Sequence, residues 1–128
     1  MNIQRAIEFL RPNTKYYFNG DLGYKYLVWP NTSVRPTELE IAGADLPAAK
    51  AERISKVKWE ASLRIYASYP AYAQSNAALG IYDNLDNTDP WFLANMKQGI
   101  QTIINSERAA EGAINALTTS DAVDSFTW

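Results

Sequence analysis

The sequence predicts an α+β protein, with a short N-terminal helix and a two-stranded β-hairpin as a head, followed by a mostly α-helical hairpin or bundle. Three observations support this prediction. Apolar residues recur at helical spacing near the N-terminus, a stretch rich in Tyr and Trp follows, and the rest of the chain carries helix start signals and helical periodicity. We expect the head at residues 1–46 and the helical region at residues 47–128.

The first element is a short amphipathic helix over residues 2–11. Its apolar residues recur at steps of one to three positions on one face, and they are Ile3, Ala6, Ile7 and Leu10. Pro12 and Asn13 follow directly, and both residue types end helices.

The segment KYYFNGDLGYKYLVW predicts a β-hairpin with arms at residues 16–18 and 24–29 and a turn at residues 19–23. Side chains alternate between the two faces of a strand, so one face is expected in the core. The expected core residues of the head are Ile7, Phe18, Tyr26, Val28 and Ile41. An isolated hairpin is only marginally stable in water, so the opposite face, with Tyr17 and Trp29, also needs cover.

Two helices are predicted next. Thr37 is a good N-cap, and Glu40 three residues later completes a capping box for a helix over residues 38–43, with Gly43 as its end. Pro47 begins the following helix, which runs to about Tyr69. One apolar stripe of that helix is Ile54, Val57, Ala61 and Ile65, and a second is Trp59, Leu63 and Tyr66. Two stripes indicate contact with more than one neighbour.

The last third predicts a helix over residues 71–85 and a long C-terminal helix over about residues 90–117, separated by the break DNTDP. A near-heptad apolar seam runs along the long helix and is interrupted by Glu107. The seam residues are Met96, Ile100, Ile103, Ala110, Ile114 and Leu117. The seam closes on the 47–69 helix of the same chain or on another subunit. The short tail after it forms a docked final turn or a protruding hook.

Composition narrows the chemistry. The 128 residues include neither cysteine nor histidine, which excludes disulfides, thiolate and imidazole metal sites, and triads that use a histidine base. Residues 1–69 carry 10 basic and 7 acidic side chains, a net charge of +3, whereas residues 70–128 carry 2 basic and 7 acidic side chains, a net charge of −5. The whole chain therefore has a net charge of −2. We therefore expect no nucleic-acid partner, no membrane span, no metal, no cofactor and no enzymatic activity.

Aspartates at residues 83, 86 and 89 lack the alternating ligands, glycine and distal glutamate of a calcium loop, so helix capping explains them better. Protein contact is the expected role of the apolar residues that a small core leaves uncovered, since Tyr and Trp anchor interfaces. The candidate contact residues are Tyr17, Trp29, Met96, Ile100, Ile103, Phe126 and Trp128.

The N-terminal third resembles the XkdW-like proteins of phages and prophages. The likeness covers roughly residues 3–50, and its matching pieces are Ala6-Ile7, Arg11-Pro12-Asn13, Trp29, Pro36-Thr37-Glu38 and Glu40-Ile41. This resemblance implies a small α+β head, encoded among tail genes close to tail-fibre or baseplate genes, and it brings no catalytic residues. The helical C-terminal part, with its acidic tail ending in Trp, is weakly similar to the ends of tail-fibre assembly proteins.

These expectations lead to one main functional hypothesis, a non-catalytic structural or adaptor component of a phage virion tail. Its partner is expected to be a tail-fibre or baseplate protein, or a second copy of the chain. One alternative is a tail-fibre assembly chaperone that works in the host cytoplasm and is absent from the finished virion. The other is a carbohydrate-binding module that uses its surface aromatics.

Overall fold

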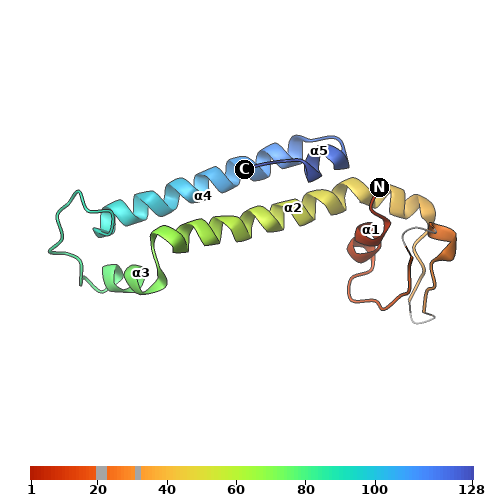
Figure 1. Ribbon diagram of the computed structural model, residues 1–128, viewed down its shortest axis with the longest axis horizontal. Coiled ribbons are helices and arrows are strands. Elements are labelled where there is room, and N and C mark those ends of the chain that lie inside the picture. The colour runs from red at the N-terminus through yellow and green to blue at the C-terminus, as the bar shows by residue number, and fades with distance from the viewer. Residues whose placement is uncertain (20–22, 31–32) are drawn as a thin grey trace. The chain divides into compact units, whose positions relative to one another are not determined.

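The computed structural model describes residues 1–19, 23–30 and 33–128, and this part of the chain is mostly helical (Figure 1). Its elements are α1 (Ile3–Leu10), the short 3-10 turn η1 (Tyr24–Tyr26), α2 (Glu38–Ser68), α3 (Ala71–Ala78), α4 (Leu93–Ala116) and α5 (Ser120–Asp124). The predicted α+β class is wrong. Within the described residues there is no sheet, and a single isolated antiparallel bridge joins Tyr17 to Val28.

The chain forms two compact units. Unit 1 comprises Met1–Arg53 and Ala116–Thr127, and unit 2 comprises Ile54–Asn115 together with Trp128. Helix α2 contributes its first half to unit 1 and its second half to unit 2.

Helix α1 agrees with the helix predicted over residues 2–11. Asn2 caps it, because its side-chain oxygen accepts a hydrogen bond from the Arg5 backbone N–H at 3.0 Å. Ala6 and Ile7 on its inner face are fully buried. The core cluster around them also contains Leu27, Ile41 and Ala44.

The predicted hairpin is absent because the main chain uses its hydrogen bonds elsewhere. Tyr17 and Val28 exchange two bonds of 3.1 and 2.8 Å, as an antiparallel pair does. Before this pair, however, the backbone N–H groups of Tyr26 and Leu27 donate to Gly23 and Tyr24 within η1. After it, Pro30 has no N–H to extend the ladder. The predicted turn at residues 19–23 includes residues 20–22, which lie outside the described residues.

The η1 turn also changes which side chains enter the core. Tyr26 and Val28, both expected inside, are 49% and 61% exposed, whereas Leu27 between them is 4% exposed. The strict alternation of a strand does not apply where the chain makes a 3-10 turn. Phe18 is partly buried against the core of unit 1, and Ile7 and Ile41 are buried as expected.

Helix α2 is one continuous helix where two were predicted. The capping box is present, because Thr37 Oγ1 accepts from the Glu40 backbone N–H at 3.1 Å and Glu40 Oε2 accepts from the Thr37 N–H at 2.8 Å. Gly43 does not end the helix, and Pro47 lies inside it. Pro47 cannot donate to the Gly43 carbonyl. Burial on both sides of this missing bond keeps the helix continuous, and the buried residues are Ile41, Ala44, Ala48 and Ala49.

Unit 2 is built on the second half of α2 and on α4, which lie side by side there and are linked by an ion pair of 3.2 Å between Lys58 and Glu111 (Figure 1). Helix α3 ends at Ala78, earlier than predicted, and the chain then turns through Gly80, whose φ is +80°. Helix α4 begins at Leu93, close to the predicted start. Asp89 Oδ1 accepts from the Trp91 N–H at 2.8 Å, and the Asp89 carbonyl accepts from the Phe92 N–H at 3.0 Å, so this aspartate stabilises the turn before α4 instead of capping the helix as predicted.

Replacement by alanine is expected to have opposite effects at different glycines in the helices. A Cβ at Gly99 in α4 would overlap the Tyr69 hydroxyl and lie 2.7 Å from its Cζ, whereas a Cβ at Gly112 or Gly43 would meet nothing. Gly112→Ala and Gly43→Ala are therefore expected to stabilise the protein by up to about 1 kcal/mol, the helix preference of alanine. Gly99→Ala is expected to destabilise it by about 1–3 kcal/mol because Tyr69 must leave its place.

Urea unfolding of the three alanine variants tests this prediction. Adding Tyr69→Phe to Gly99→Ala is expected to recover part of the loss, since the overlapping hydroxyl is removed. Equal stabilisation by all three alanines would contradict the packing of Tyr69 against α4.

Candidate functional site

The strongest candidate site is a shallow, mostly apolar groove on unit 1, formed where the two extended segments meet at the Tyr17–Val28 bridge. Its volume is about 300 Å³, and it is lined by Lys15, Tyr16, Tyr17, Val28, Trp29 and Pro30. Two of the candidate contact residues from the sequence, Tyr17 and Trp29, therefore lie in one groove. We call this surface the aromatic groove.

Part of the aromatic groove is fixed in place. The rings of Tyr16 and Trp29 stack with their centroids 5.6 Å apart, and Trp29 Nε1 donates to the Ser33 carbonyl at 3.0 Å. The Tyr16 hydroxyl lies 3.4 Å from Glu8 Oε1 on α1, and burial together with this carboxylate raises the pKa of Tyr16. A stacked, hydrogen-bonded pair of rings loses little entropy when a partner docks on it.

The other part of the groove is open. Tyr17 is 69% exposed and Val28 is 61% exposed, although both are bridged through their backbones. Their side chains share one face of the bridge, because directly opposite residues of an antiparallel pair point to the same side. The groove thus offers two exposed apolar side chains, while Tyr16 and Trp29, which also line it, pack against the core of unit 1.

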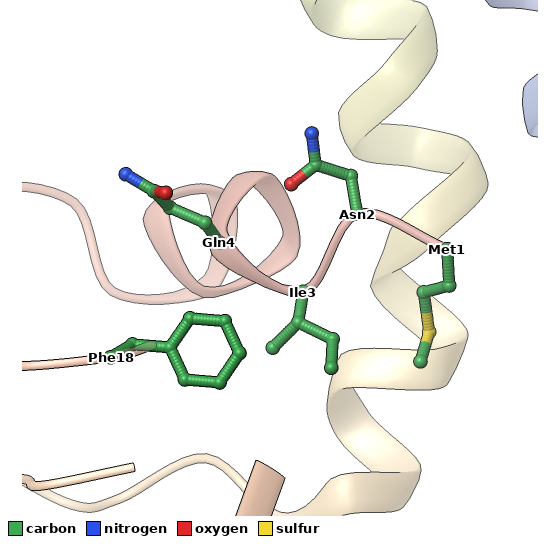
Figure 2. A pocket seen from close by; sticks show the side chains of 5 residues that line it. All are labelled: Met1, Asn2, Ile3, Gln4 and Phe18. Carbon is green, nitrogen blue, oxygen red and sulfur yellow. The ribbon is translucent and has the colours of Figure 1, made fainter. Parts of the chain in front are cut away.

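A second hollow of unit 1 lies at the start of α1 and has a volume of about 310 Å³. Met1, Asn2, Ile3, Gln4 and Phe18 line it. Figure 2 shows the side chains of Ile3 and Phe18 next to each other, while those of Asn2 and Gln4 point away from them. Asn2 caps α1 and Gln4 bonds to Glu8, so their polar groups are engaged on the helix itself. This hollow offers an apolar wall with few converging polar groups.

Arg5 holds the helices of unit 1 together. Its guanidinium bonds to Asp124 of α5 at 2.7 Å and lies 3.5 Å from Glu52 and 4.0 Å from Asp45, both on α2. The hydrogen bond with Asp124 is the main reason that the pKa of Arg5 is raised. Ser120 at the start of α5 donates to Asp45 at 2.6 Å, and this bond helps to lower the pKa of Asp45 against the opposing effect of burial.

The C-terminal tail is docked, which decides between the two forms left open by the sequence. Within unit 1, Arg53 donates to the Phe126 carbonyl at 3.1 and 2.9 Å and lies 5.8 Å from its ring. Within unit 2, the Arg64 guanidinium lies 3.7 Å from the Trp128 ring centroid, and Trp128 Nε1 donates to Ser106 at 2.9 Å. Phe126 and Trp128 are both half-buried.

The other candidate contact residues lie on α4. Met96 is 2% exposed and packs with Ala73 and Ala77 of α3, so this part of the seam is closed within the chain. Ile100 and Ile103 are half-buried.

An exposed stripe on α2 was not among the candidate contact residues. Trp59, Leu63 and Tyr66 are 61%, 48% and 56% exposed, whereas Val57 and Ala61 of the first stripe are buried. The sequence signalled this stripe by its helical spacing. It gave no sign of which stripe the rest of the chain would cover.

Glu107, which interrupts the apolar seam, shares a hydrogen bond with Glu111 on the same helix. Its Oε1 is inaccessible to solvent, and no described residue bonds to that atom. Burial and the nearby Glu111 raise the pKa of Glu107, while the hydrogen bond from Glu107 and then the interaction with Lys58 lower the pKa of Glu111. The pair is thus arranged to hold one proton.

This pair predicts a pH dependence of stability. The pKa of Glu107 is higher in the folded protein than in the unfolded chain, where it is about 4.3. Its contribution to stability is therefore complete below the unfolded pKa and is lost as the pH rises through the folded pKa. We therefore expect Glu107→Gln to be more stable than the wild type at neutral pH, because glutamine keeps the donor without the charge. The pKa of Glu111 is lowered, so this residue contributes stability at neutral pH that is lost as the pH falls through its folded pKa.

Urea titrations between mildly acidic and neutral pH measure this effect. The exposed Glu38→Gln serves as the control and is expected to follow the wild type. A Glu107→Gln variant whose stability falls with rising pH as steeply as the wild type would rule out Glu107 as the responsible group.

Among residues 1–19, 23–30 and 33–128, no group of three or more acidic side chains is placed to hold a metal ion. None of the helices described combines the length and the apolar character needed to cross a bilayer.

Comparisons with known proteins give no match: no family model, no curated protein and no solved structure is similar to this chain.

Proposed function

We propose that this chain is a non-catalytic adaptor of a phage tail, which binds a tail-fibre or baseplate protein through the aromatic groove of unit 1. The observation that carries the contact role is the exposure of Tyr17 and Val28 beside the stacked Tyr16–Trp29 pair. Exposed apolar clusters with aromatic anchors mark protein interaction sites more often than isolated apolar residues do.

The phage setting rests on the resemblance of residues 3–50 to the XkdW-like proteins. The aromatic groove lies inside that range. The α+β head implied by the resemblance is replaced here by a helix, a 3-10 turn and one bridge. The contact role of the groove does not depend on the number of strands, because the bridge alone sets Tyr17 and Val28 on one face.

Mass spectrometry of purified virions tests the proposal. We expect the wild-type chain at a fixed ratio to the other tail proteins, and we expect Tyr17→Ser to reduce its incorporation by about tenfold, as loss of an anchor residue does. Tyr17 is largely exposed, so circular dichroism of the variant should match the wild type. Tyr72→Ser, at a residue that is 60% exposed on unit 2, is the matched control.

Other outcomes lead to the alternative functions. A chain that is expressed during infection but absent from virions would contradict the adaptor and favour the assembly chaperone. A glycan-array signal that Tyr17→Ser abolishes, without any tail partner, would favour the carbohydrate-binding module.

A further inference from the structure

We propose that the exposed stripe of α2 in unit 2 is a second docking surface, and that its partner is an amphipathic helix with acidic flanks. This inference goes beyond the proposed function and does not depend on the aromatic groove. It starts from Lys56, Trp59, Leu63 and Tyr66, which follow one another at steps of three, four and three residues. That spacing places all four on one face of a helix.

The stripe is separate from the internal packing of unit 2. Val57 and Ala61, which lie between the stripe residues in the sequence, are 0% and 6% exposed. Trp59 and Tyr66 are both more than half exposed. The helix therefore has one face committed to the fold and another that presents two aromatic side chains and a leucine to the surroundings.

The shape of the stripe suits a helical partner. Helices that dock on an apolar surface read anchors at steps of three and four residues, which is the spacing of these side chains. Trp and Tyr are the residue types that most often supply interface energy. Three half-exposed side chains offer only on the order of 300–400 Å², well below the roughly 800 Å² that each partner buries in a stable complex. A transient complex is expected.

The net positive charge of this part of α2 favours an acidic partner. Between Ile54 and Ser68, helix α2 carries three basic side chains and one acidic one. Lys58 is paired with Glu111, and Arg64 covers Trp128. Lys56 lies on the stripe itself, and the described residues supply no ion-pair partner for it. A carboxylate opposite Lys56 would complete the surface.

A second copy of the chain fits less well. A two-fold dimer places the same surface on both sides, so the net positive stretch of α2 would face itself. Like charges across an interface oppose association. An acidic helix from a different protein avoids this repulsion and supplies the missing charge.

Two designed helical peptides test the proposal by fluorescence anisotropy at low salt. Both carry the same leucine stripe, and they differ only in flanking residues, which are glutamate in one and lysine in the other. We expect the acidic peptide to bind the full chain about tenfold more tightly than the basic one. Lys56→Glu should remove or reverse this preference, and Trp59→Ser should abolish binding of both peptides.

Matched controls use exposed residues outside the stripe. Lys97→Glu on α4 and Leu79→Ser, a residue that is 76% exposed, are expected to bind like the wild type. Tyr17→Ser should also bind normally, which separates this surface from the aromatic groove. Circular dichroism should show the same helix content for every variant.

Four results would overturn the proposal. They are equal binding of the two peptides, an unchanged preference in Lys56→Glu, a dimer in sedimentation that Trp59→Ser dissolves, and flotation with anionic vesicles that depends on Trp59. The dimer would assign the stripe to self-association, and the flotation would assign it to a lipid surface.

Discussion

Replacing Ile114 with alanine is expected to lower the free energy of unfolding by about 2–5 kcal/mol, the range for removing a large aliphatic side chain from a packed interior. Ile114 lies in the part of α4 that belongs to unit 2, and its exposed fraction is 0%. The loss combines the transfer of the missing methyl groups with the cavity that remains. Urea denaturation monitored by circular dichroism measures it.

The matched control is Leu79→Ala, because Leu79 is 76% exposed in the same unit. Exposed substitutions of this kind change stability by less than about 0.5 kcal/mol. If Ile114→Ala cost no more than Leu79→Ala, the assignment of Ile114 to the interior would be wrong. The apolar seam of α4 would then have to be available for another subunit.

Replacing Arg5 with methionine is expected to destabilise unit 1 by about 2–3 kcal/mol. The Arg5 side chain is only 12% exposed and contacts carboxylates on two other elements, so its removal leaves Asp45 with less compensation. The loss is expected to be smaller than for a fully buried pair, because Asp124 and Glu52 are 50% and 65% exposed. Thermal unfolding at low and high salt measures the change.

A double-mutant cycle with Asp124→Asn isolates the strongest contact of Arg5. Each single substitution removes the same 2.7 Å bond. We therefore expect the sum of the two single losses in unfolding free energy to exceed the loss in the double variant. Lys97→Met, at an exposed position on α4, controls for the change of charge. Strict additivity would mean that the Arg5–Asp124 contact adds nothing to stability.

The helix boundaries that local chemistry determines were predictable. Thr37 and Glu40 form the capping box that their spacing indicates, and the first helix begins and ends close to the predicted residues. Caps depend on a few neighbouring side chains, so they can be read from a short stretch of sequence.

The hairpin was not predictable from the same kind of pattern. Alternating Tyr, Leu and Val residues are equally compatible with a strand and with the observed turn, because the difference lies in where the Tyr26 and Leu27 N–H groups donate. Main-chain hydrogen bonds leave no trace in side-chain periodicity. The error placed Val28 inside and overlooked Leu27, yet it left Tyr17 and Trp29 on a common surface.

Helix α2 shows a related limit. A glycine and a proline four residues apart predicted a break, but burial around Ala44 and Ala48 outweighs the single hydrogen bond that Pro47 removes. Likewise, the sequence identified two apolar stripes without indicating that the Trp59 stripe would stay exposed. Which stripe is covered depends on tertiary packing.

Site-specific photo-crosslinking at residue 17 tests most directly whether the aromatic groove is a protein-contact surface. A photoreactive phenylalanine analogue replaces Tyr17 in the full chain during phage production, and the same analogue at Val34, which is 75% exposed, serves as the control. We expect one discrete adduct with a tail-fibre or baseplate protein from position 17 and none from position 34. An identical pattern from both positions, or no adduct from position 17 in particles that contain the chain, would contradict a contact role for the groove.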